Sequence, residues 1–153
     1  MLNLKNQETK YVACLKQTTQ PEQWPIVFET LLADAKHPSQ RMALYHLEGM
    51  YTELFAELCQ HPSLSCFQHY EEDLRLWNSE RALNYYMEIL KKEMDTASDR
   101  KQYRQIIRYL SDLDAYPNGQ KAAQQIADYW YVYHKNRPAM KDELQKAGYP
   151  QSK

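Results

Sequence analysis

Apolar residues recur at intervals of three and four along most of the chain, the spacing that lines one face of an α-helix. The repeat is clearest between residues 78 and 148, where Asn78 can cap a helix, Pro117 precedes a turn and Gly148 suits a left-handed helix end. Four helices are expected there. The inward faces predicted for the first three are Leu83, Tyr86, Met87, Leu90 and Met94; Tyr103, Ile106, Ile107, Leu110 and Leu113; and Ala122, Ile126, Tyr129 and Tyr133, with Trp130 beside them.

The first half of the chain predicts four more helices. A weak one covers residues 2–17, a strongly amphipathic one follows Pro21, a long one runs from Pro38 to His61, and the last spans 63–77. Eight helices joined by short polar turns pair naturally as antiparallel hairpins. The predicted fold is therefore all-α, a right-handed, tetratricopeptide-like α-solenoid in a single domain 1–153. Its four hairpins are expected near 1–36, 38–77, 78–116 and 117–148.

Composition agrees with a helical protein in a reducing compartment. The 153 residues include only 3 glycines and show no alternating apolar and polar segments, so a sheet is not expected. No apolar run is long enough for a membrane span, and residues 1–16 are too polar for a secretory signal. The 3 cysteines are an odd number and indicate no disulfide framework. We therefore expect a cytoplasmic protein without a membrane partner.

The net charge of −1 is unevenly distributed. Residues 1–77 contain 6 basic and 10 acidic side chains and residues 78–153 contain 13 and 10, so the halves carry −4 and +3. Arg100, Arg104 and Arg108 repeat every fourth position and share one side of a predicted helix, next to Lys101. This row could offer donors to carboxylates or phosphates of a partner. Alternatively, it is a solvated face paired with acidic residues of the preceding helix, such as Glu88 or Glu93.

Aromatic residues suggest a second candidate contact. The chain has 13 tyrosines, and Tyr131 is predicted to point away from the face formed by Tyr129 and Tyr133. It is therefore a candidate for an exposed anchor at a protein interface or a stacking platform for bases. The alternative is packing between hairpins, with the hydroxyl bonded to a carbonyl or water.

One cluster could hold a metal. Cys59, His61, Cys66 and His69 follow each other across a predicted turn and could converge as tetrahedral zinc ligands. The spacing is not one of the usual zinc patterns, and the alternative of buried cysteines and turn histidines is favoured, so no metal is expected. No nucleophile elbow, phosphate-binding loop or His-Glu-x-x-His motif occurs. We expect neither enzymatic activity nor a cofactor.

Several short runs resemble a known family. They are Trp24-Pro25, Arg81-Ala82-Leu83-Asn84-Tyr85-Tyr86, Tyr103-Arg104, and Arg137-Pro138-Ala139-Met140-Lys141-Asp142-Glu143-Leu144 with Ala147-Gly148. Together they are similar to the helical-repeat region that follows the zinc finger in bacterial SWIM zinc finger proteins, over residues 21–149. The Cys-x-Cys and Cys-x-His pairs of the finger itself are absent. The resemblance therefore implies no zinc ligand, only the structural positions Trp24, Tyr103, Arg137, Pro138, Leu144 and Gly148.

The resemblance also implies a tetratricopeptide-like scaffold that acts through DNA or protein contacts. The function expected from the sequence is accordingly a non-enzymatic scaffold that binds another protein, with Arg100, Lys101, Arg104, Arg108 and Tyr131 as candidate partner-binding residues. A nucleic-acid-binding or DNA-linked accessory role, using the same basic face, is the alternative.

Overall fold

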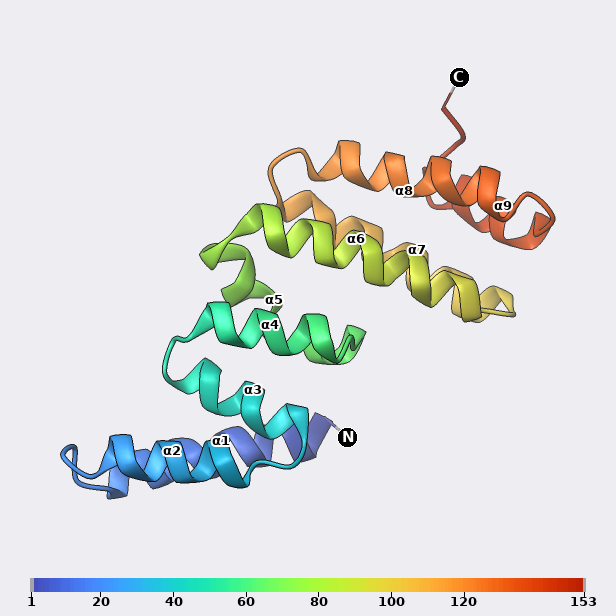
Figure 1. The fold of residues 1–153 in the computed structure, drawn as a ribbon. Coiled ribbons are helices and arrows are strands. Elements are labelled where there is room, and N and C mark those ends of the chain that lie inside the picture. The colour runs from blue at the N-terminus through green and yellow to red at the C-terminus, as the bar shows by residue number, and fades with distance from the viewer. Residues whose placement is uncertain (1, 153) are drawn as a thin grey trace. The chain divides into compact units, whose positions relative to one another are not determined.

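The computed structural model describes the backbone of residues 2–152 and the side chains of residues 10–152 (Figure 1). Every regular element in this part of the chain is helical, which confirms the all-α prediction. The elements are α1 (Leu2–Thr18), α2 (Trp24–Asp34), α3 (Pro38–Leu47), α4 (Tyr51–Gln60), α5 (Leu64–Trp77), α6 (Ser79–Thr96), α7 (Arg100–Arg108), the 3-10 helix η1 (Tyr109–Ala115), α8 (Gly119–Tyr133) and α9 (Pro138–Lys146). They form two compact units, Met1–Phe67 and Gln68–Lys153. The expectation of one domain over 1–153 stays a prediction.

In the first unit, α3 is the central helix, because α1, α2 and α4 all pack against it. Its core includes Val12, Trp24, Phe28 and Leu44. Glu48 accepts hydrogen bonds at 2.8 Å from the Trp24 indole and at 2.8 Å from Lys16. These two donors, Lys16 first, lower the pKa of the Glu48 carboxyl. One carboxylate thereby ties α1 and α2 to the end of α3.

The long helix expected between Pro38 and His61 is two helices. Gly49 has a φ of +68°, the left-handed conformation that glycine adopts without strain. Its amide donates to His46 O, and the amide of Met50 donates to Tyr45 O at 2.8 Å, which together form a Schellman ending of α3. The sequence prediction was wrong here because the apolar stripe continues in phase across the break.

In the second unit, α6 packs on α8, and α7 packs on α9. All five inward residues predicted for residues 98–116 are buried, from Tyr103 to Leu113, although the second half of that segment is 3-10 rather than α-helix. Met140 and Leu144 of α9 are buried as well, and Gly148 adopts the predicted left-handed conformation with a φ of +91°. Ala147, at the end of α9, is exposed.

Two buried tyrosines connect the helices of the second unit through carboxylates. The Tyr86 hydroxyl donates to Asp112 at 2.9 Å, and the Tyr116 hydroxyl donates to Glu71 at 2.6 Å. Burial is the main cause that raises the pKa of both phenols far above the usual value. Both tyrosines therefore stay protonated and act as hydrogen-bond donors that position α5, α6 and η1.

Candidate functional site

The basic row predicted from the sequence lies on α7, whose start is fixed by local hydrogen bonds. The Asp99 side chain accepts from the backbone amide of Gln102 at 2.8 Å, the usual contact of a helix N-cap. Tyr103, Ile106 and Ile107 face the core. Arg100, Arg104 and Arg108 are therefore directed to the outer side of the same helix, and all three are exposed.

Two arginines of the row bind carboxylates of α9. Arg100 Nη1 lies 2.8 Å from Asp142 Oδ2 and 3.0 Å from Glu143 Oε1, and Arg104 Nε lies 3.7 Å from Glu143 Oε2. The hydrogen bond from Arg100, followed by that from Lys146, lowers the pKa of Asp142. The arginines pair with α9 rather than with Glu88 or Glu93 of the preceding helix, and Glu88 instead pairs with Lys91 at 3.3 Å.

Glu143 is the member of this candidate site that sequence reasoning missed. Only 7% of its side chain is exposed, so the shared carboxylate is nearly buried between two arginines that are largely in solvent. The sequence does contain a pattern that could have identified Glu143. Glu143 lies three residues after Met140 and directly before Leu144, which places a carboxylate next to the inward stripe of α9.

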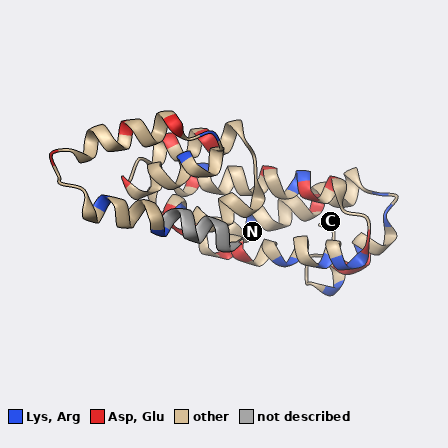
Figure 2. Cartoon of the chain, turned by 90° about the horizontal axis from the view of Figure 1, so that it is seen from below, with Lys and Arg blue, Asp and Glu red and all other residues tan. Residues whose placement is uncertain are grey.

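Next to these ion pairs, a groove of about 290 Å³ opens between α7 and α9. It is lined by Arg104, Ile107, Arg108, Glu143, Lys146 and Ala147. Arg108 has no ion-pair partner among residues 10–152, whereas Lys146 pairs with Asp142 at 3.1 Å on the exposed side of α9. The groove thus contains three cations and a single, already paired carboxylate. Figure 2 shows basic and acidic positions interspersed on the helices near the C-terminus.

Lys101 is exposed but does not belong to this groove. It follows Arg100 directly, and one residue along a helix turns the side chain by about 100°. The structure therefore brings together Arg104 and Arg108 of the predicted set, keeps Arg100 beside them through Glu143, and separates Lys101.

The prediction that Tyr131 is an exposed anchor is wrong. Tyr131 is 4% exposed, and its hydroxyl donates to the carbonyl oxygen of Tyr149 at 2.8 Å. The buried face of α8 is rotated from the predicted one, since Trp130 and His134 are buried too, while Tyr133 is 59% exposed. The exposed aromatic pair is Tyr129 and Tyr133, whose rings stack at 5.2 Å.

The low-probability zinc cluster does not form. Cys59, His61 and Cys66 all lie in the first unit, yet no three His, Cys, Asp or Glu side chains among the described residues come close enough to hold a metal ion. His69 contacts the ring of Tyr70 edge-on, with centroids 4.6 Å apart.

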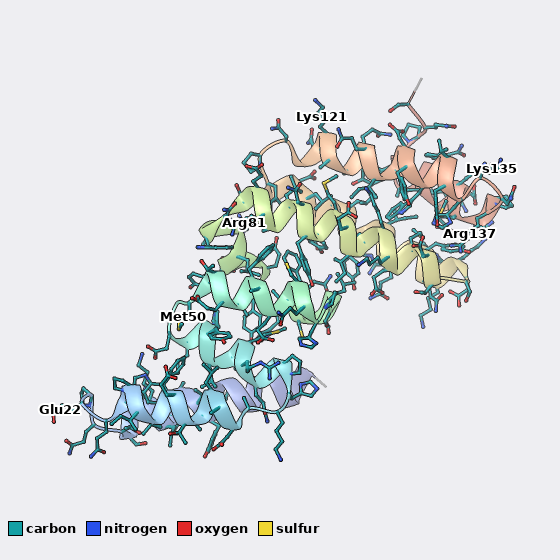
Figure 3. All side chains as sticks on the ribbon, viewed as in Figure 1. Glu22, Met50, Arg81, Lys121, Lys135 and Arg137 are labelled. Carbon is teal, nitrogen blue, oxygen red and sulfur yellow. The ribbon has the colours of Figure 1, made fainter. Side chains whose placement is uncertain are left out.

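Arg137, one of the positions implied by the resemblance, has a clear structural role. Its guanidinium donates to the carbonyl oxygens of Met94, Asp95 and Ala97 at 2.8 to 3.2 Å, and it lies over the Tyr103 ring. Figure 3 labels Arg137 at the turn between α8 and α9. The side chain adds hydrogen bonds to carbonyls at the C-terminal end of α6 and so holds the last hairpin against α6.

One buried titratable group lies close by. His134 Nε2 is 3.2 Å from Asp95 Oδ1. Burial, together with the charge of Arg137, outweighs the attraction of Asp95 and lowers the pKa of His134. His134 is therefore neutral near pH 7 and belongs to the packing of α8 rather than to the groove.

Comparison with known proteins gives no family for this chain. No family model matches it, and neither a curated protein nor a solved structure is similar enough to count as a match. The resemblance to SWIM-associated repeats consequently stays a prediction. Of the helices described above, none has an apolar stretch that could span a bilayer.

Proposed function

We propose that this chain is a non-enzymatic scaffold that binds an acidic segment of another protein in the groove between α7 and α9. The observation that carries the proposal is the excess of cations in this groove. Arg104, Arg108 and Lys146 face one buried carboxylate, and Arg108 lacks a partner within the described residues. Positive charge of this kind attracts and orients a complementary acidic surface.

The wider architecture supports a scaffold of repeated hairpins. In the second unit, the first helices of successive hairpins, α6 and α8, pack together, and so do the second helices, α7 and α9. Contacts between successive hairpins support the predicted tetratricopeptide-like solenoid, in which each hairpin would bury its apolar face on the next. We propose that the predicted solenoid extends this arrangement, and that the groove lies on the surface formed by its second helices.

A protein partner fits the groove better than a nucleic acid does. Asp142 and Glu143 alternate with the arginines, and a phosphate backbone would pass close to both carboxylates. Tyr131, the proposed stacking platform, is buried and cannot contact bases. Nucleic-acid binding is therefore the competing outcome of the experiment below.

The test is affinity capture of the tagged chain from its native lysate, with and without nuclease, followed by mass spectrometry. Wild type is compared with Arg104→Glu/Arg108→Glu and with the matched control Lys121→Glu/Lys135→Glu, which changes two exposed cations, one on α8 and one in the turn after it, by the same charge. We expect a stoichiometric protein that survives nuclease, is retained by the control and is lost from the arginine variant. Capture that disappears with nuclease, or that is equal in all three proteins, rejects the proposal.

A further inference from the structure

We propose that the groove binds a carboxylate of the partner between Arg108 and Lys146, beside an apolar side chain that lies over Ile107 and Ala147. This inference rests on the proposed function and specifies the chemistry of the bound segment. The preferred ligand is a stretch in which aspartate or glutamate alternates with apolar residues.

The chain itself shows which ligand the arginine row accepts. Arg100 and Arg104 each contact a carboxylate of α9, and Arg108 follows one helical turn later, on the same side of α7. α7 and α9 run in the same direction in Figure 1, and the adjacent acids Asp142 and Glu143 of α9 lie beside Arg100 and Arg104. The acids end at Glu143, and the next position on this face of α9 is Lys146. At the third arginine, the carboxylate is missing.

The geometry leaves donors available at that place. Arg108 has five N–H donors and no acceptor, and none of them is used in an ion pair with residues 10–152. Lys146 pairs with Asp142 only on the exposed surface, and such a pair exchanges readily with a competing carboxylate because solvent screens it. An incoming carboxylate would thus extend the existing ladder of ion pairs by one step.

The floor of the groove selects an apolar neighbour for that carboxylate. Ala147 is exposed in it, Ile107 lies at its base with 2% of its surface exposed, and the aliphatic stems of the arginine and lysine side chains add further apolar surface. An alternating segment can place its acidic side chain on the cations and its apolar side chain on this floor. A uniformly acidic segment would gain only the first contact.

The same geometry disfavours a phosphate. Glu143 lines the groove and is fixed by two arginines, so an added anion lies close to a negative charge. A singly charged carboxylate meets less repulsion there than a doubly charged phosphate group.

Arg108 and Lys146 also lie in the last turns of their helices, where cations stabilise the helix dipole. If that were their whole role, removing them would lower stability without affecting any ligand.

The experiment uses a fluorescein-labelled peptide of repeating Glu-Leu pairs and measures fluorescence anisotropy with the whole chain. Repeating Gln-Leu and Glu-Gly peptides and inorganic phosphate as competitor are the matched probes. We expect saturable binding of the Glu-Leu peptide, weaker binding of Glu-Gly, none of Gln-Leu, and little competition by phosphate. Absence of saturable binding up to about 1 mM peptide, or equal binding of the Gln-Leu peptide, overturns the inference.

Variants locate the contact. Arg108→Gln/Lys146→Gln should weaken Glu-Leu binding about tenfold, the scale of one charge-assisted contact, while Lys121→Gln/Lys135→Gln should not. Arg108→Lys keeps the charge and should retain most of the binding, which separates loss of a contact from loss of folding. Unchanged binding by Arg108→Gln/Lys146→Gln rejects the carboxylate site.

The two proposals fail in different ways. A native partner lost from Arg104→Glu/Arg108→Glu but kept by Arg108→Gln/Lys146→Gln preserves the proposed function and removes this inference. A partner kept by both variants removes the proposed function itself.

Discussion

The two units use arginine and carboxylate side chains in opposite ways. In the first unit, Arg41 and Glu57 form a two-point contact at 2.6 and 3.2 Å, with side chains that are 23% and 12% exposed. In the second, one nearly buried carboxylate, Glu143, is shared by two exposed arginines, and a third arginine remains beyond it. The first arrangement matches its charges and joins helices. The second leaves a surplus of positive charge at the surface, which is what a binding site for anions needs.

The largest effect is expected from a variant that breaks the ion pair between Arg41 and Glu57. Arg41→Ala removes the contact to Glu57 and a hydrogen bond to the carbonyl of Ala35, and leaves the half-buried Glu57 without its cation. We expect the free energy of unfolding to fall by about 2 kcal/mol. Urea unfolding of this variant and of the exposed control Lys36→Ala measures it. A loss no larger than that of the control would mean that the pair does not stabilise the first unit.

Glu143→Gln, in the second unit, should lower the stability of the protein but strengthen peptide binding. Removing the charge takes a partner from Arg100 and Arg104, so stability should fall by about 1 kcal/mol. The groove gains positive charge at the same time, and the Glu-Leu peptide should bind several-fold more tightly. Thermal unfolding and anisotropy on the same protein measure both. Weaker peptide binding would show that Glu143 positions the ligand instead of competing with it.

The stabilities of the two units should respond to acid at different pH values. His134 in the second unit has a lowered pKa, so the unfolded state binds more protons and stability falls as pH drops below about 6.5, the ordinary histidine pKa. In the first unit, Glu48 has a lowered pKa, and its contribution is lost only at pH values below the usual range of carboxyl groups. Melting temperatures between pH 7.5 and 5 should decrease, and His134→Gln should flatten this decrease. An identical slope in the variant contradicts the assignment.

The smallest effect is expected at Lys101. This lysine is exposed on α7 but lies off the arginine row, so Lys101→Ala should change neither the melting temperature nor Glu-Leu binding measurably. Arg108→Ala on the same helix serves as the comparison and should weaken binding. Equal losses in the two variants would indicate that the total charge of α7, and not the row, attracts the ligand.

The helical class and several core faces could be predicted from the sequence, because apolar spacing follows burial wherever polar residues flank it. Tyr103, Ile106 and Ile107 sit between arginines and glutamines, which leaves only one possible inward face. In α8, Tyr129 to Tyr133 are five consecutive apolar or amphipathic residues, so two faces fit the period equally well. The residue that accepts the hydrogen bond of the Tyr131 hydroxyl, Tyr149, lies 18 positions after it.

The candidate groove was only half predictable for a similar reason. The arginine repeat is a local pattern and is visible in the sequence. Its counter-ions depend on the approach of α9, which lies 42 and 43 positions further along the chain. The break at Gly49 was missed because apolar periodicity records which side is buried and carries no information on where a left-handed residue interrupts the backbone.

The contacts of Arg137 also limit where residues can be inserted into the chain. Its hydrogen bond to Ala97 closes a loop of 40 positions that contains α7, η1 and α8. A single residue inserted within α8 would rotate everything after it by about 100° and carry the guanidinium away from the three carbonyls. Alternative lengths should therefore be tolerated poorly inside that loop's helices.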